Sequence, residues 1–234
     1  MGGRLSAENG AVVTPSQASV VTREPVTRDR AVRLAVDIAD AGGIDSLSMR
    51  KLARELGIEP MSLYYHVKNR DDLLDAMVGS VVSEIPLPLE DAPWKTAMRE
   101  RAESARSVLR QHPWAISLID SRTTTATLAQ HNAVAGCLRH AGFSVPLAAH
   151  AMSLLDSYVH GFALQEASLP VDASGDISEA TESIMGQADM MSNAFPHLAE
   201  MAVTHILQPG YAYGNEFKFG IQLILDGIER ALAA

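Results

Sequence analysis

The stretch Ser48–Arg70 constrains the fold more than any other part of this sequence. Its first half carries apolar residues at the i, i+3, i+4 and i+7 positions of one buried helical face, namely Met49, Leu52, Ala53 and Leu56. Gly57 follows where a helix ends, because glycine adopts a left-handed backbone conformation at little cost. Pro60 suits the first position of a second helix, which the pattern predicts over about residues 60 to 66.

Two short helices joined by a glycine turn form the pattern of a helix-turn-helix, in which the second helix lies in the major groove of DNA. The same spacing also suits an ordinary helical hairpin inside a larger helical protein. Periodicity alone does not separate these two interpretations, so the identity of the residues becomes important.

Those residues resemble a known family. The run Leu63–Arg70, LYYHVKNR, looks like the DNA-binding domain of the TetR family of transcriptional regulators. The run Met49–Ala53, MRKLA, resembles the second helix of that family, and the alanine-rich helix that ends before Gly43 resembles its first helix. The likeness covers about residues 26 to 78. It implies a three-helix DNA-binding domain of the helix-turn-helix type.

The net charge of −9 is unusual for a DNA-binding protein, but its distribution is uneven. Residues 1–72 carry ten Lys and Arg against ten Asp and Glu, whereas residues 73–234 carry nine against eighteen. Because DNA is a polyanion, the acidic part repels it. Contact with DNA is therefore expected at one end of the molecule only.

The composition indicates a soluble protein of one or two domains, since 47% of the residues are hydrophobic and 20% are charged. The single cysteine, Cys137, excludes an internal disulfide and fits a reducing cytosol. No apolar run approaches the roughly 18 residues of a membrane span. The N-terminus shows no secretory signal. We therefore predict a cytoplasmic protein without a membrane segment.

Helical periodicity continues through the rest of the chain, and no alternating strand pattern appears. The linker 86–93 contains three prolines, which forbid a continuous helix there. Helices are expected at about residues 28–41, 69–85, 94–111, 114–120, 124–141, 145–167, 178–206 with a break near Pro196, and 213–232.

Glycines interrupt two of the C-terminal helices. Gly220 and Gly227 lie seven residues apart on one face of the last helix, and Gly161 lies in the helix 145–167. Since glycine in a helix interior costs about 1 kcal/mol relative to alanine, these positions suggest the close approach of another helix. That helix belongs either to the same chain or to a second subunit, which would give a four-helix bundle.

The second half of the chain resembles the tetracycline-repressor branch of the same family. The likeness rests on the segments Ala141–Ser144, Gly161–Leu164 and Phe217–Glu229, and it spans most of residues 94 to 232. It implies a homodimer formed through helices at these positions. It also implies that each subunit encloses a pocket for a small molecule.

The predicted organisation is therefore all-α, with three parts. Residues 1–25 form a flexible extension, for which a basic arm in the minor groove is the alternative. Arg4 and Arg23 are sparse support for such an arm. Residues 26–72 form an N-terminal helix-turn-helix three-helix domain, and residues 73–234 form a C-terminal helical ligand-binding and dimerisation domain.

The resemblance also implies which side chains contact double-stranded DNA. Base contacts are expected from Arg50, Pro60, Met61 and Ser62. Contacts with the sugar–phosphate backbone are expected from Ser62, Tyr64, Tyr65, His66 and Arg70. For Tyr64 the alternative is packing against the first helix. Pro60 and Met61 offer only apolar contacts, so the operator sequence cannot be transferred from relatives.

For the ligand pocket, the positions that match the family are Arg122, His131, Val134, Met152 and Asp156. Apolar neighbours are expected at Trp114, Phe143, Leu155 and Val159. A charged Arg122 among apolar helices needs a partner, which is Asp156, an anionic ligand, or another residue in an ordinary ion pair. The magnesium-binding histidine of the tetracycline repressor has no counterpart here, so neither a metal nor a cofactor is implied.

These expectations combine into a ligand-responsive repressor that binds a palindromic operator as a homodimer. A small molecule in each pocket favours a separation of the two DNA-binding domains that no longer matches the operator, and the helix 69–85 transmits the change. An activator with the same fold remains an open alternative, because the sequence does not give the direction of regulation.

A helical metalloenzyme is the alternative from another class. Its ligands would come from the set Asp156, His160, His197, Glu200 and His205. No His-Glu-x-x-His or Glu-x-x-His motif supports it, and no nucleophile elbow, phosphate-binding loop or dinucleotide fingerprint appears. Cys137 lies in an apolar helical stretch and suits a core position better than a nucleophile. We therefore predict that the protein is not an enzyme.

Overall fold

The structure, a computed structural model, describes residues 25–169 and 193–234. Within these ranges it contains helices and no strands, as the sequence predicts. The α-helices are α1 (Arg28–Gly42), α2 (Met49–Leu56), α3 (Pro60–Leu63), α4 (Arg70–Val82), α5 (Trp94–Gln111), α6 (Ile116–Ile119), α7 (Thr125–His140), α8 (Val145–Ser168), α11 (Pro196–Met201) and α12 (Gly214–Ala233). The predicted extension before residue 25 and the part of the predicted helix 178–206 before residue 193 lie outside the described residues.

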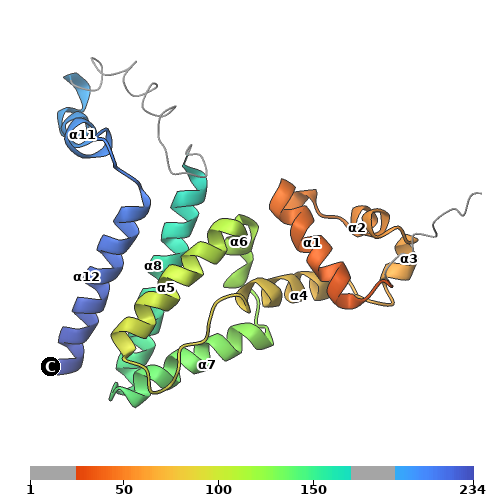
Figure 1. The fold of residues 1–234 in the computed structure, drawn as a ribbon, viewed down its shortest axis with the longest axis horizontal. Helices are drawn as coiled ribbons and strands as arrows, with labels where there is room; N and C mark the ends of the chain where they lie inside the picture. The colour runs from red at the N-terminus through yellow and green to blue at the C-terminus, as the bar shows by residue number, and fades with distance from the viewer. Residues whose placement is uncertain (1–24, 170–192) are drawn as a thin grey trace, which may run out of the picture.

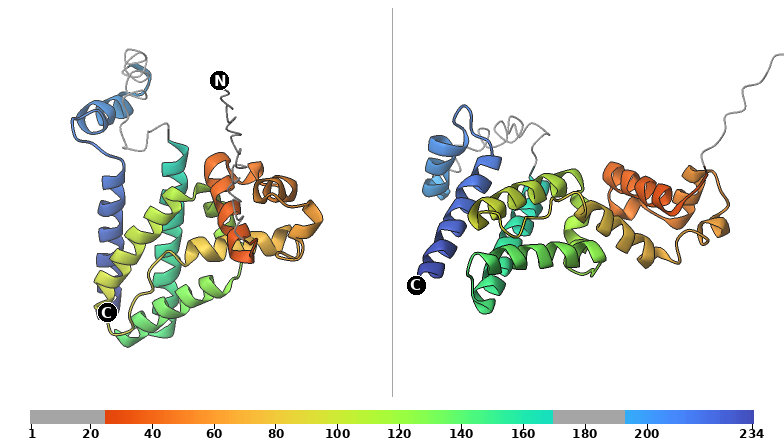
Figure 2. Two further views of the ribbon diagram at one scale, coloured as in Figure 1. Left: turned by 45° about the vertical axis from the view of Figure 1, so that its right-hand side comes forward. Right: turned by 60° about the horizontal axis from the view of Figure 1, so that its bottom comes forward.

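The described part of the chain is elongated, with helices α1 to α3 at one end and α8 and α12 towards the other (Figure 1). Helix α4 leads from the first group into the second, and the two further views in Figure 2 show the same arrangement. We call α1 to α3 the head and the helices from α5 onwards the body. In the described ranges, no helix is both long and apolar enough to cross a membrane.

The head forms because its helix ends are well capped. Thr27 Oγ1 accepts a hydrogen bond from the Arg30 amide at 3.2 Å, and Ser48 Oγ accepts one from the Lys51 amide at 3.2 Å. Gly57 ends α2 with a φ of 71°, as its left-handed role requires. Helix α3 is shorter than the sequence predicts, because the chain turns back towards the core after Leu63.

Helix α4 is apolar along most of its length because it is covered on two sides. Asn69 caps it by accepting a hydrogen bond from the Asp72 amide at 2.8 Å. The helix packs against α1 in the head and against α7 in the body. Its buried residues are Leu73, Leu74, Met77, Val78, Val81 and Val82. The helix ends at Val82, three residues earlier than predicted, and Ile85 still packs into the core.

In the body, α5 and α8 pack against one another and α12 packs against both of them. The largest fully buried side chains there include Phe143, Phe217, Met98 and Leu138. Helix α11 and the π-helical turn Ala202–Ile206 that follows it lie beyond the N-terminal end of α12 (Figure 1).

The glycines of α8 and α12 have different roles. At Gly220 a Cβ atom would lie 2.1 Å from the hydroxyl of Tyr158 on α8, so here the close neighbour belongs to the same chain. That hydroxyl donates to the carbonyl oxygens of Glu216 and Phe217, each at 3.2 Å. At Gly161 and Gly227, by contrast, no described atom outside the adjoining chain of the same helix lies within 4 Å of the position that a Cβ would occupy. Gly161 is therefore exposed in the described protomer, and Gly227 is partly exposed and has room beside it.

Candidate functional site

The residues predicted to contact DNA lie in α2, in α3, in the turn that follows α3 and at the first residue of α4, and none of them is buried. Tyr65 is 90% exposed and Met61 is 74% exposed, although both are large apolar or aromatic side chains. Arg50, Pro60 and Arg70 are also exposed, whereas Ser62 and His66 are half-buried. Tyr64 is 46% exposed, which does not suit the alternative of a core residue packed against α1. Leu63 and Val67 beneath them are buried and anchor this surface to the head.

An ion pair holds the segment that follows α3. The guanidinium of Arg28 donates to both carboxylate oxygens of Asp72, at 2.7 and 2.8 Å. The same group donates to the carbonyl oxygen of His66 at 3.1 Å. Asp72 also accepts from the Lys68 amide at 2.9 Å. The hydrogen bonds from Arg28 and then from Lys68 lower the pKa of Asp72 to about 2, so it is a carboxylate at neutral pH.

The body contains a cavity of about 190 Å³. Its walls come from the end of α4, from α5, from the segment between α6 and α7, and from α7 and α8. The apolar part of the wall is formed by Val82, Ile85, Ala105, Leu109, Ile119, Leu128 and Val159. The polar part is formed by Arg101, Asp120, Arg122, Thr123, Thr127, Gln130, His131, Asp156 and His160.

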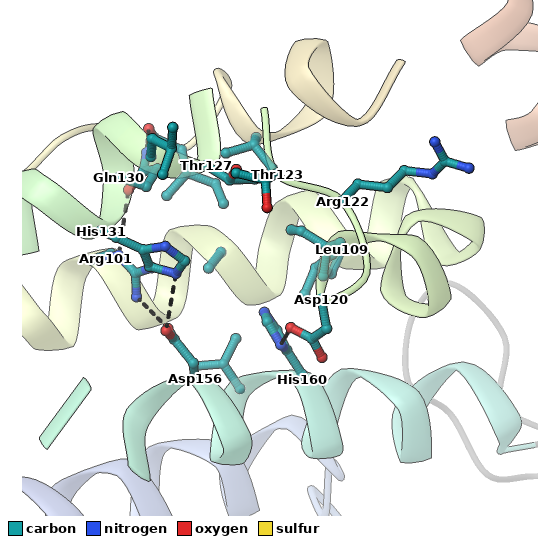
Figure 3. Close-up of a pocket in the computed structure, with 16 residues that line it drawn as sticks. Arg101, Leu109, Asp120, Arg122, Thr123, Thr127, Gln130, His131, Asp156 and His160 are labelled. Carbon is teal, nitrogen blue, oxygen red and sulfur yellow. Dashed lines mark hydrogen bonds and ion pairs between the residues drawn. The ribbon is translucent and has the colours of Figure 1, made fainter. Parts of the chain in front are cut away.

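The polar groups of the cavity form two clusters (Figure 3). In the first, Arg101 of α5 donates to Asp156 of α8 at 3.1 Å and to Gln130 of α7 at 3.4 Å. His131 Nε2 lies 3.7 Å from the other oxygen of Asp156. In the second, His160 Nδ1 lies 3.0 Å from Asp120. The cavity thus offers hydrogen-bonding groups at two places, and apolar side chains form much of the remaining wall.

Arg122 connects the cavity wall to α4. Its side chain extends away from the two polar clusters in Figure 3 and pairs with Asp75 at 2.5 Å and Asp71 at 3.2 Å. Burial lowers the pKa of Arg122, but the hydrogen bonds to Asp75 and Asp71 outweigh this effect and raise it. Arg122 therefore pairs with α4 and not with Asp156, and this ion pair accounts for its charge.

Four of the nine residues predicted for the pocket line the cavity, namely Arg122, His131, Asp156 and Val159. The other five lie elsewhere. Val134, Phe143 and Leu155 are buried in the helical core, and Phe143 packs edge-on against Trp94 with ring centroids 5.0 Å apart. Met152 is half-buried and packs against the core away from the cavity.

Trp114 is the fifth of these residues, and it belongs to the junction between head and body. Its indole Nε1 donates to Asp40 of α1 at 2.7 Å, and Nδ1 of the buried His112 lies 2.8 Å from the same oxygen. His112 Nε2 lies 3.4 Å from Glu84, just after α4. Trp114 thus makes a hydrogen bond between the head and the body. The apolar periodicity of the sequence does not indicate this role.

Arg101, Gln130 and Asp120 line the cavity, although the sequence does not predict them as pocket residues. The sequence does contain an indication that Arg101 is functional or paired, because this residue falls within the apolar stripe of α5. That stripe is formed by Ala97, Met98, Ala102, Ala105, Val108 and Leu109. A charged residue in such a stripe needs a partner, which Asp156 supplies. Gln130 donates to the carbonyl oxygen of Ile85, a contact across 45 residues that sequence spacing does not reveal.

The metalloenzyme alternative is not favoured by the geometry. Asp156 and His160 have separate partners, and His205 Nε2 lies 2.9 Å from Glu216 at the start of α12. Among residues 25–169 and 193–234, no three His, Cys, Asp or Glu side chains are grouped so as to hold a metal ion. Burial raises the pKa of the Cys137 thiol, which therefore lacks the thiolate character of a nucleophile.

The exposed helix-turn-helix surface and the helical body with its cavity define a two-domain, DNA-binding transcription regulator, and the comparisons agree. Residues 32–77 match the family described as "Bacterial regulatory proteins, tetR family", and residues 87–232 match the family described as "Tetracyclin repressor-like, C-terminal domain". The chain belongs to the TetR family of transcriptional regulators. As a member of this family it is a regulator and not an enzyme, and regulators of this kind bind DNA operators and small-molecule ligands.

Individual relatives agree over most of the chain. The transcriptional repressor DrrR1 of Streptomyces coeruleorubidus is 33% identical over 89% of this chain and 79% of its own length. The class E tetracycline repressor of Escherichia coli is 28% identical over 87% and 91%. The structure of apo ActR from Streptomyces coelicolor, 29% identical, superposes with a TM-score of 0.69 over 90% of this chain and all of that one. A structure of ActR in complex with actinorhodin is 28% identical and superposes with a TM-score of 0.68 over 90% of this chain and 100% of that one.

Proposed function

We propose that the protein is a repressor that binds a palindromic operator as a homodimer in the bacterial cytoplasm and leaves it when a small molecule enters the body. The observation that supports this most is the course of α4. Its first turns carry Asp71, Asp72 and Asp75, which pair with the head and with Arg122, and its last residue, Val82, lines the cavity. Helix α4 therefore contacts both the DNA-binding head and the cavity, the two sites that the proposal couples.

The cavity wall supports a ligand with an apolar body and hydrogen-bonding groups at its edges. Each charged residue in the wall already has an ion-pair partner. A ligand therefore binds most favourably when it forms hydrogen bonds with these residues and leaves their ion pairs intact. A molecule that fills the space between α4, α5 and the segment 119–123 displaces the wall that Arg122 ties to α4. The operator is released only to the extent that the ligand binds the two positions of α4 with different affinity.

The outer face formed by α8 and α12 supports the homodimer. A groove between these helices is lined by Leu147, His150, Ala151, Leu154, Leu223, Ile224, Gly227, Ile228 and Ala231. Leu154 is 47% exposed and Leu223 is 54% exposed in the protomer. A contiguous apolar groove of this kind is typical of a subunit interface. A two-fold axis through it forms a bundle of two helices from each protomer and places two heads on one face of DNA.

Operator binding is tested by fluorescence anisotropy with the DNA upstream of the protein's own gene. Substituting Arg50→Ala or Tyr65→Ala removes exposed side chains of the head, so both variants should keep the wild-type stability to within about 0.5 kcal/mol. Both should bind the operator at least about tenfold more weakly, as expected for the loss of one good base or backbone contact. Leu89→Ala, an exposed change in the linker, is the control. Unchanged binding in both variants would defeat the assignment.

The homodimer is tested by sedimentation equilibrium. Leu223→Glu places a charge in the α8–α12 groove and should shift the protein towards the monomer, because an unpaired charge in an interface core is costly. Leu87→Glu, which changes an equally exposed leucine in the linker, should leave the dimer intact. A monomeric wild type, or a Leu223→Glu variant that dimerises as the wild type does, would contradict the proposal.

Ligand release is tested with actinorhodin as the first probe, since it is the ligand in a solved ActR complex. Titration into the protein–operator complex should lower the anisotropy of the DNA, and Val159→Trp, which fills the cavity from α8, should prevent this. If actinorhodin has no effect on the wild type, a panel of molecules with an apolar body and oxygen-rich edges follows. If no molecule that binds the cavity releases the DNA, coupling through α4 is refuted.

A further inference from the structure

The DNA-facing surface is held by little structure of its own. Helix α3 has four residues, and the chain after it returns to the core at Val67. The carbonyl oxygen of Leu63 accepts from the amides of His66 at 2.9 Å and Val67 at 3.1 Å. A helix of one turn is not stable by itself, because few internal hydrogen bonds offset the cost of ordering it. The placement of Met61 to His66 therefore depends on contacts from outside this segment.

Arg28 and Asp72 supply such contacts from two other helices. Arg28 starts α1 and Asp72 lies in the first turn of α4, and their bidentate pairing fixes both distance and orientation. From this pair, Arg28 holds the carbonyl oxygen of His66, and Asp72 holds the amide of Lys68. The segment between α3 and α4 is thus held by two hydrogen bonds, one donated by Arg28 and one accepted by Asp72, and these two residues are paired with one another.

We propose that Arg28 and Asp72 are positioning residues for DNA recognition, which set where α3 and the following turn lie relative to α1 and α4. This inference rests on the proposed function, in which that surface reads the operator. Arg28 acts through its hydrogen bonds to Asp72 and His66 and is not a phosphate contact. Asp72 acts in the same way, although as an anion next to the DNA-binding head it repels the phosphates.

A purely electrostatic role and the positioning role give opposite expectations for Asp72→Asn. The substitution removes one negative charge next to the DNA, so charge alone makes the variant bind all DNA more tightly. The positioning role makes it bind the operator more weakly, because the asparagine side chain cannot accept both hydrogen bonds from the guanidinium and also that of the Lys68 amide. The sign of the change therefore separates the two roles.

Asp29→Asn is the matched control. Asp29 follows Arg28 in the first turn of α1 and is exposed, and the substitution changes the net charge by the same amount without touching the Arg28–Asp72 pair. Arg28→Lys is a second variant, which keeps the positive charge but loses the two-pronged geometry that only a guanidinium provides. Circular dichroism and thermal unfolding establish that each variant is folded before binding is measured.

The experiment measures the affinity of each full-length variant for the protein's own upstream DNA and for a scrambled duplex, by anisotropy over a range of salt concentrations. Asp72→Asn and Arg28→Lys should lose about tenfold or more in operator affinity, as expected for the loss of hydrogen bonds to a charged group. Affinity for the scrambled duplex and the slope of log K against log salt should stay unchanged or rise slightly. Asp29→Asn should bind both duplexes at least as tightly as the wild type.

Three outcomes would overturn the inference. The first is operator binding by Asp72→Asn that equals or exceeds that of Asp29→Asn, and the second is a loss of affinity that is equal for both duplexes. The third concerns a further variant, Arg28→Ala, which removes the guanidinium: a salt slope that falls by about one would mark a lost phosphate contact. A wild type that does not distinguish its upstream DNA from the scrambled duplex would instead refute the proposed function. The two failures are therefore distinguishable.

Discussion

Asp40 at the end of α1 joins the head to the body, and replacing it with alanine should weaken both the fold and operator binding. Its carboxylate accepts from the indole of Trp114 at 2.7 Å, and the ring nitrogen of His112 lies 2.8 Å from the same oxygen. Both aromatic side chains are buried. Asp40→Ala leaves two buried nitrogens without this acceptor and releases the end of α1 from the body.

The size of the effect follows from these contacts. Each hydrogen bond to a charged group contributes about 1.5–3 kcal/mol to stability. The two bonds share one oxygen, and the Asp40 side chain is 28% exposed, so water replaces part of the loss. We expect the free energy of unfolding to fall by about 2 kcal/mol, which for a chain of this size lowers the melting temperature by about 4–8 °C.

Urea unfolding at one fixed protein concentration measures this effect, because the stability of a dimer depends on concentration. Asp37→Ala, one turn earlier on the exposed side of α1, is the matched control and should change stability by less than about 0.5 kcal/mol. An Asp40→Ala variant that lies within about 0.5 kcal/mol of the wild type would refute the reasoning. So would an unchanged operator affinity, since the head would then not depend on the junction for its position.

Further substitutions test the packing of the helices and the response to acid. Gly220→Ala should destabilise the protein by about 1–3 kcal/mol, because its new Cβ meets the Tyr158 hydroxyl. Gly136→Ala makes only ordinary van der Waals contacts and should stabilise the protein slightly. Thermal unfolding of both variants tests this difference. Gly227→Ala should weaken the dimer in sedimentation equilibrium although its Cβ meets no described atom in the protomer, and an unaffected dimer would place the interface elsewhere. The pKa of Asp72 is lowered from its usual 3.8 to about 2, so its contribution to stability is present above pH 4 and lost as the pH falls through 2. The midpoint of urea unfolding should therefore fall less steeply with pH over this range in Asp72→Asn than in the wild type. Midpoints that fall in parallel in the two proteins would contradict the ion pair.

The sequence predicts the head well because the relevant signals are local. Ser48, Gly57 and Pro60 act on their own or neighbouring backbone, and the structure places a cap, a left-handed turn and a helix start at these residues. The helices of the body follow from apolar periodicity in the same way. The limits of α3 and α4 are less accurate, because the chain ends these helices where tertiary packing of Val67 and Ile85 requires a turn.

The pocket is harder to predict because its residues come from five separate parts of the chain. The family resemblance predicts His131 and Asp156 as pocket residues, and both line the cavity and lie close to one another. Trp114 does not line this cavity, since its partner Asp40 is 74 residues away and belongs to the head. Arg122 lies at the cavity, but its partners Asp71 and Asp75 are 51 and 47 residues away on α4, so local sequence spacing does not reveal them.

The central claim is that this chain recognises a two-fold operator as a homodimer, and footprinting of its own upstream DNA at about 50 mM and 200 mM salt tests it most directly. The proposal requires a discrete protected region with two inverted half-sites, whose centres lie about one helical turn of DNA or a multiple of it apart, and which persists at the higher salt in the presence of competitor DNA. Diffuse protection that vanishes at the higher salt would show only charge-driven contact, and would contradict sequence-specific recognition by the head at that site.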